Sequence, residues 1–280
     1  MDNRLLVARQ SATAGGLLDL VPGAAAAYSL RSLSKTYTDP VVTVRRSSDD
    51  AEGSFTATEV SDGTLSAFCG VGDGFVKQWW DQSGNARHAT NTTPAQQPKI
   101  CSSGTIVESE GKPAIQFETT DAAGNYIRLQ TAAFSVAIPQ PATCFIACNQ
   151  LATDDRQTPV DGRVNQFMFA TDFGTGVYSM AADPAVILDS TTPLQTGSSM
   201  FSALFDTSSS YMRLNGAGIA SGTIGSYALD GITIGNIRGT PTPISGGYSW
   251  IGTIQELIVY PSDQTANREL IEGNIAWSYS

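Results

Sequence analysis

The residues best suited to chemistry lie in one short stretch, 74–90, which reads GFVKQWWDQSGNARHAT. It holds two adjacent tryptophans, then Asp81, and the only histidine of the chain, His88. Asp81 and His88 are the types of side chain that act as acid and base, and a tryptophan ring can stack on a sugar. The structural alternative is an Asx-type turn, in which Asp81 and Asn85 bond backbone amides. We favour the structural turn, formed by Trp80, Asp81, Ser83, Gly84 and Asn85.

Other nucleophiles and metal ligands do not form a recognised constellation. The sequence has no G-x-S-x-G elbow, no H-E-x-x-H and no P-loop. Its four cysteines, at 69, 101, 144 and 148, are too scattered for a disulfide framework, and no C-x-x-C suggests zinc. On a strand, Cys144 and Cys148 would face one side about 13 Å apart, beyond the roughly 7 Å limit for a bridge. We therefore expect buried thiols.

Composition excludes several classes of partner. The 280 residues carry a net charge of −10, with no basic stripe to displace counterions from nucleic acid. The first twenty residues contain no apolar run typical of a signal peptide, and no segment reaches membrane-spanning length. We expect synthesis in a cytoplasm, and neither a nucleic-acid nor a membrane partner.

The elements that must position these residues are predicted to be short strands. Runs of four to nine β-branched and aromatic residues recur between turn residues. The predicted strands are 41–45, 74–80, 114–117, 126–130, 143–148, 166–171, 185–189, 200–206, 211–215, 232–235 and 252–260. Asn215-Gly216 is a strong hairpin signal at the end of one of them.

Helical periodicity is scarce. A short turn is predicted around 64–69, and one clear helix over 263–277. Pro261-Ser262-Asp263 offers the N-cap of that helix, and Arg268 and Glu272 form an i, i+4 pair. The sequence therefore predicts one all-β domain of packed antiparallel sheets with a C-terminal helix over residues 21–280, preceded by an N-terminal arm, residues 1–20.

Three separated stretches resemble a known family: GAAAAYSLRSLSKTYTDPVVTVRRSSDD (23–50), GFVKQWWDQSGNARHATNTTPAQQPKI (74–100) and GTIQELIVYPSDQTANRELIEGNI (252–275). Together they resemble a phage structural-protein family with a concanavalin A-like, laminin-G-type jelly roll. They are more distantly similar to the catalytic domain of fungal α-L-arabinofuranosidase B. The resemblance implies an antiparallel β-sandwich, a fold that serves lectins, hydrolases and capsid proteins alike.

The resemblance also gives a test of enzyme activity, because a retaining glycosidase needs two carboxyl groups roughly 5 Å apart. In the arabinofuranosidase relatives, the nucleophile is a Glu two residues after an Asp. The matching positions here are Asp189 and Thr191, and threonine cannot form the glycosyl ester without an activating base. Their acid/base Asp follows an IGG-type strand end, which is matched here by Asn236, Ile237 and Arg238. We therefore expect no catalytic residues and no glycoside hydrolase activity.

Two functions fit these expectations. The first is a non-enzymatic bacteriophage virion protein of the head or tail, which binds other virion proteins through its arm and forms a homo-oligomer, with a trimer favoured. The second is a carbohydrate-binding, lectin-like module that contacts host surface glycans; an arabinofuranosidase-like hydrolase is a third alternative. The expected glycan contacts are Asp189, Asn236, Arg238, Tyr178 and Trp250.

No cofactor and no metal site are expected, with calcium left open. Laminin-G-like folds often hold calcium through Asp and backbone oxygens. The loop acids Asp49, Asp50, Asp81 and Asp121 would supply ligands of that type, but no D-x-D-x-D-G run is present.

Overall fold

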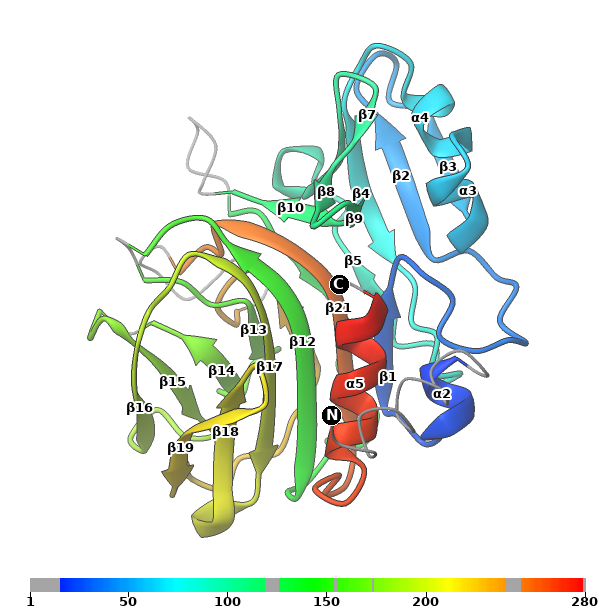
Figure 1. The fold of residues 1–280 in the computed structure, drawn as a ribbon. Coiled ribbons are helices and arrows are strands. Elements are labelled where there is room, and N and C mark those ends of the chain that lie inside the picture. Colours follow the sequence, from blue (N-terminus) through cyan, green and yellow to red (C-terminus); the bar gives the residue numbers. More distant parts are fainter. Residues whose placement is uncertain (1–15, 119–125, 154–155, 173, 240–247, 279–280) are drawn as a thin grey trace.

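A computed structural model of the chain describes residues 16–118, 126–153, 156–172, 174–239 and 248–278 (Figure 1). Strands dominate it, and most pair antiparallel with their neighbours. Among the described helices, none is long and apolar enough to cross a bilayer.

The first layer is a large antiparallel sheet built around two long strands, β12 (Ala142–Gln150) and β21 (Gly252–Tyr260), which pair along their whole length. On the other side of β12 lie β17 (Gly197–Phe205), β18 (Ser210–Leu214) and β19 (Ala217–Gly222). The free side of β21 takes β1 (Ala26–Ser29) and β10 (Ile115–Phe117). The sheet continues through β6 (Lys99–Ser102), β4 (Gly74–Trp79), β2 (Val42–Arg46) and β3 (Glu52–Phe55).

The second layer consists of seven shorter strands. In spatial order they are β16 (Ile187–Pro193), β15 (Val177–Ala181), β14 (Met168–Thr171), β13 (Val160–Gly162), β20 (Ile232–Ile234), β11 (Leu129–Gln130) and β5 (Ala89–Thr90). The last strand, β5, pairs with the end of β4. Strand β4 therefore belongs to both layers, and the predicted antiparallel β-sandwich of the jelly-roll type is confirmed.

Smaller elements complete the chain. They are the strand β7 (Thr105–Ile106), the hairpin of β8 (Glu108–Ser109) and β9 (Lys112–Pro113), the helices α2 (Leu17–Leu20), α3 (Ala57–Ser61), α4 (Thr64–Cys69) and α5 (Arg268–Ser278), and the 3-10 turns η1 (Pro94–Gln96) and η2 (Thr207–Ser209). The predicted hairpin turn joins β18 to β19, where Asn215 and Gly216 both have positive φ, 50° and 82°. This is the conformation that Asn-Gly adopts at low cost.

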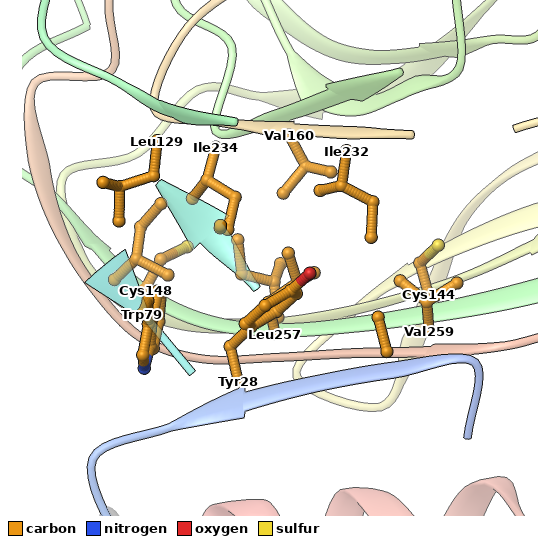
Figure 2. Close-up of a cluster of buried hydrophobic side chains, with 14 of the residues drawn as sticks. Tyr28, Trp79, Leu129, Cys144, Cys148, Val160, Ile232, Ile234, Leu257 and Val259 are labelled. Atoms are coloured by element: carbon orange, nitrogen blue, oxygen red, sulfur yellow. The ribbon is translucent and has the colours of Figure 1, made fainter. Parts of the chain in front are cut away.

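The core lies between the two layers. Figure 2 shows Leu129, Val160, Ile232 and Ile234 from the second layer above side chains that include Tyr28, Trp79, Leu257 and Val259 from the first. Each of these side chains is buried, and burial of one such side chain stabilises the fold by about 1.5–3 kcal/mol. Cys144 and Cys148 point into the same space as free thiols, as predicted.

A second, smaller core lies on the outer side of β12 and β21, under helices α5 and α2 (Figure 1). The predicted ion pair of Arg268 with Glu272 is present, at 2.5 Å. The helix begins at Arg268 and not at 263, because the Asp263 carboxylate accepts the Thr265 amide at 2.7 Å in a local turn. Leu17 of α2 is fully buried in this core, so the packed part of the chain includes residues 16–20 of the predicted arm. Residues 1–15 lie outside the described residues.

The loop after β4 fastens the N-terminal strand to the sandwich. The buried Asp81 carboxylate accepts the amides of Ala27 at 2.8 Å, Ser83 at 2.9 Å and Arg87 at 3.0 Å, and the Ser83 hydroxyl at 2.8 Å. The Asn85 side chain donates to the carbonyls of Ala24 and Ala25, both at 3.1 Å. Gly84 provides the positive φ, 86°, that the turn requires.

The rings of Trp80 and His88, beside this loop, also form hydrogen bonds within the fold. The Trp80 indole N–H donates to the Thr43 hydroxyl at 2.9 Å. Nδ1 of His88 accepts the Asp81 amide at 3.1 Å, and the imidazole lies 4.7 Å from the Trp80 ring, centroid to centroid. Burial lowers the pKa of His88 from 6.5, against the opposing charge of Asp81. A neutral imidazole that accepts a backbone proton has a structural role here.

We predict that Asp81→Ala lowers the free energy of unfolding by about 3 kcal/mol, because it leaves the buried amide of Ala27 and the partly buried amide of Arg87 without an acceptor. Urea denaturation followed by tryptophan fluorescence measures the change. Asp39→Ala, which removes an exposed carboxylate on a neighbouring loop, is the matched control and should change stability by less than about 0.5 kcal/mol. Equal effects of the two substitutions would contradict the role assigned to Asp81.

Candidate functional site

Polar side chains gather on the face of the second layer that points away from the core. In β13, Val160 enters the core and the next residue, Asp161, points to the opposite face. Asp161 pairs with Thr233 of β20, which lies between two core isoleucines, and the neighbouring residue of β11 is Gln130. The Gln130 amide donates to the Thr233 hydroxyl at 2.8 Å. The strand alternation therefore places a row of hydrogen-bonding groups on the outer face.

Asp161 is the central charged group of this row. Its side chain is fully buried and accepts the amides of Gly162 at 2.7 Å, Phe167 at 2.9 Å and Arg238 at 2.9 Å. The Arg238 guanidinium lies 3.4 Å from the same carboxylate. Burial disfavours the charged form and raises the pKa of Asp161 to about 6, although the backbone donors and Arg238 act in the opposite direction.

The segment after β20 folds over this row. Gly235 begins it with φ of 84°, and an added Cβ there would lie 2.0 Å from the Phe117 ring, so only glycine fits. The buried Asn236 side chain donates to the Ser249 hydroxyl at 2.9 Å and accepts the Ile237 amide at 2.8 Å. Asn236 therefore ties the two ends of the 236–249 segment together. Arg238 stays partly exposed.

An apolar patch continues the same outer face. Met168 of β14 and Ala181 of β15 are covered by Ile237, with the partly exposed ring of Tyr248 packed against them. The exposed Arg156 guanidinium lies 5.6 Å from the centre of that ring and donates to its hydroxyl at 3.0 Å. An aromatic face beside a cationic hydrogen-bond donor is an arrangement that can contact a sugar ring.

Asp189 adds an exposed carboxylate to the described part of this face. It lies on β16, and the Ser179 hydroxyl of β15 donates to it at 2.6 Å. Strands β14 and β15 separate it from Asp161, a lateral distance of about 14 Å at about 4.8 Å per strand. Asp189 and Asp161 are therefore too far apart to act together as the two carboxyl groups of a glycosidase.

The structure separates the five residues that the sequence marked as glycan contacts. Asp189 and Arg238 reach the outer face, and Asn236 lies buried beneath it. Tyr178 and Trp250 are fully buried in the main core. The Tyr178 hydroxyl accepts the amide of Gln195 at 3.0 Å, and its ring packs on Phe201. Both rings are out of reach of a surface ligand because they fill the space between the layers.

Three residues of this face were not predicted from sequence: Asp161, Arg156 and Tyr248. Asp161 follows an apolar residue on a strand of only three residues, which is too short for its alternation to be recognised. Arg156 and Tyr248 lie in loops about ninety residues apart, where sequence periodicity carries no information.

The acids named as calcium ligands have other partners. Asp49 pairs with Arg46 at 2.7 Å and Asp50 with Arg45 at 2.7 Å. Asp81 is bound to backbone amides, and Asp121 lies outside the described residues. Within the part of the chain that the structure describes, no group of three or more His, Cys, Asp or Glu side chains is arranged to hold a metal ion.

Comparison with known proteins adds a family match over part of the chain and a similarity of fold. Residues 19–139 match the model of a family described as alpha-L-arabinofuranosidase B, catalytic. None of the curated proteins that were compared matches the sequence. The matched segment contains β1, the loop after β4 and the start of the second layer.

Solved structures match over most of the chain. One is an arabinofuranosidase complexed with arabinofuranosyl-alpha-1,2-xylobiose, with 16% identity and a TM-score of 0.56. Another is a GH54 α-L-arabinofuranosidase soaked with a cyclic sulfate inhibitor, with 16% identity and a TM-score of 0.54. Each match covers 90% of this chain and 62% of the other chain. At this identity the similarity establishes the fold, and the chain spans under two thirds of the length of these enzymes.

These findings correct two expectations. The prediction of a bacteriophage virion structural protein is wrong, because the family model and the structural neighbours point instead to an arabinofuranosidase catalytic or glycan-binding fold. The prediction that the chain has no glycoside hydrolase activity is contradicted by the same matches. It was based on Thr191 and Asn236, two positions without a carboxyl group, although other acids lie on the same face.

The raised pKa of Asp161 predicts an unusual pH dependence of stability. Between pH 3.8 and about 6 the folded protein holds a proton that the unfolded chain has lost, so this group destabilises the fold as pH rises through that window. Relative to Asp161→Asn, the wild type should lose about 3 kcal/mol of unfolding free energy between pH 4 and 7. Urea denaturation at both pH values measures it, and a wild-type curve parallel to that of the variant would contradict the prediction.

Proposed function

We propose that this chain is a glycoside hydrolase domain of the α-L-arabinofuranosidase type, which acts on arabinofuranosyl groups of glycans. The observation that carries the proposal is the match of residues 19–139 to the arabinofuranosidase B catalytic family. The similarity of the fold to two arabinofuranosidase structures over 90% of the chain supports it. The substrate class is inferred from the names of those enzymes.

The outer face of the second layer is the proposed sugar site. Tyr248 offers an aromatic face, and Arg156 and Arg238 offer guanidinium donors for sugar hydroxyls. Asp189 adds an exposed acceptor whose orientation is held by Ser179. An aromatic face together with a few polar groups is the usual chemistry of a small-ligand site.

Hydrolysis requires carboxyl groups, and Thr191 and Asn236 do not supply them. Among the described residues, Asp189 has an exposed carboxylate on the proposed face, so we assign it to the contact with the sugar at the reacting end. Asp161 lies beneath Arg238 and has no exposed surface. Its role is to hold the main chain and the guanidinium of Arg238 in place.

Turnover of 4-nitrophenyl α-L-arabinofuranoside tests the proposal, and we expect release of nitrophenol that is proportional to enzyme concentration. 4-Nitrophenyl β-D-glucopyranoside is the control and should not be cleaved. Calorimetric titration with arabino-oligosaccharides separates binding from cleavage. Binding without turnover would show a glycan-binding module and would contradict the enzymatic part of the proposal.

We predict that Asp189→Asn lowers kcat/KM on the arabinofuranoside at least about 100-fold, the loss typical of a carboxyl group that takes part in proton transfer or contact with the transition state. Asp62→Asn, an exposed aspartate between α3 and α4, is the matched control and should leave kcat/KM unchanged. The melting temperatures of the variants should agree. Full activity of Asp189→Asn would show that Asp189 is not part of the active site.

A further inference from the structure

Two of the four cysteines lie next to each other, far from each other in sequence. Cys69 is the last residue of helix α4, and Cys101 lies on β6, where it pairs with Gly74 of β4. Both side chains are buried, with exposed fractions of 3% and 0%. Besides burial, which raises the pKa of both, the two thiols influence each other's pKa: Cys101 raises the pKa of Cys69, and Cys69 acts to lower that of Cys101.

Gly74 makes room for this contact. A Cβ added to Gly74 would lie 2.6 Å from Sγ of Cys69 and 3.1 Å from Cβ of Cys101. The Cys69 sulfur therefore occupies the space that a side chain at Gly74 would fill, and Cys101 borders the same space. The two side chains therefore border one space.

The backbone around the two thiols is held from both sides. The Gly104 amide donates to the Gly72 carbonyl at 2.8 Å, and the Ser66 hydroxyl donates to the Gly104 carbonyl. These bonds keep the end of α4 and the turn after β6 together whether or not a covalent bond joins them. A disulfide here would join two segments that hydrogen bonds already hold side by side.

We propose that Cys69 and Cys101 form a disulfide bond that fastens helix α4 to strand β6. The co-reactant is a small-molecule disulfide such as oxidised glutathione. One thiolate attacks its S–S bond and releases one reduced glutathione. The second thiolate then attacks the mixed disulfide and releases the other, so that two thiols are oxidised and one disulfide is reduced.

The environment of the thiols determines when the bond forms. Burial raises the pKa of Cys69 to about 12, and burial also raises the pKa of Cys101. Because the thiolate is the reactive species, the two buried thiols react slowly once the chain is folded. The disulfide therefore forms during folding, before the two thiols become buried beside Gly74.

Cys144 and Cys148 provide an internal comparison. Both are buried free thiols on β12, and they lie four residues apart on one strand, about 13 Å from Cα to Cα. No bridge can join them without unfolding the strand. The members of both pairs are therefore buried. Cys144 and Cys148 are held too far apart for a bridge, whereas Cys69 and Cys101 border the same space.

The test is to refold the full chain from denaturant in a glutathione redox buffer and to digest it with trypsin without reduction. We expect one cross-linked species of residues 47–77 with 100–128, which separates into two peptides on reduction. Thiol titration of the unfolded product should find two free thiols, and four after reduction. The oxidised protein should melt about 5–15 °C above the reduced protein, from the loop-closure entropy of a bond over this span.

Cys148→Ala is the matched control and should still form the cross-link, whereas Cys101→Ala should not. Neither readout requires enzymatic turnover, so the result is independent of the proposed function. If the refolded protein keeps four titratable thiols, the proposal is wrong. A cross-linked species that contains the peptide 129–156, with Cys144 and Cys148, would also overturn it.

Discussion

The fold depends on one buried carboxylate at the point where its two layers meet. Asp81 accepts the amide of Ala27 in β1 and the amides of Ser83 and Arg87 in its own loop, and so joins the loop to β1 with one side chain. Strand β1 pairs with the central strand β21, while β4, which precedes Asp81, pairs with both layers. A buried acceptor that is fully bonded stabilises such a junction, whereas its removal exposes several donors at once.

The position of the candidate site follows from this junction. Strand β5 returns from the Asp81 loop and pairs with β11, which pairs with β20. Strand β20 leads directly into the segment that carries Asn236 and Arg238, and Asp161 on the neighbouring β13 holds the Arg238 amide. The strands that form the outer face are therefore linked one after another to the Asp81 junction. Buried polar hydrogen bonds, such as that of Asp161 with the Arg238 amide, lie beneath the exposed groups of this face.

The fold was predictable because its signals are local. Long alternating strands, the Asn215-Gly216 turn and the common side of Cys144 and Cys148 follow from strand periodicity. The candidate site could be predicted only in part from the sequence, because aromatic residues occur both in cores and in sugar-binding sites. Tyr178 and Trp250 turned out to be core, whereas Tyr248, which does reach the surface, was not marked. What decides between these roles is the packing of segments distant in sequence, such as Tyr178 on Phe201.

Similarity of fold and identity of chemistry are separate questions in this chain. The fold is similar to that of arabinofuranosidases over 90% of this chain and 62% of theirs, but neither Thr191 nor Asn236 has a group that titrates near neutral pH. The exposed Thr191 hydroxyl can hydrogen-bond to a sugar without acting as acid or base, whereas the buried Asn236 amide is bonded within the protein. Apart from the exposed Asp189 carboxylate, the groups assigned to the proposed sugar site are neutral or cationic. Whether the scaffold cleaves its ligand depends on the acids that it brings to the sugar, and the shape of the sandwich alone does not determine this.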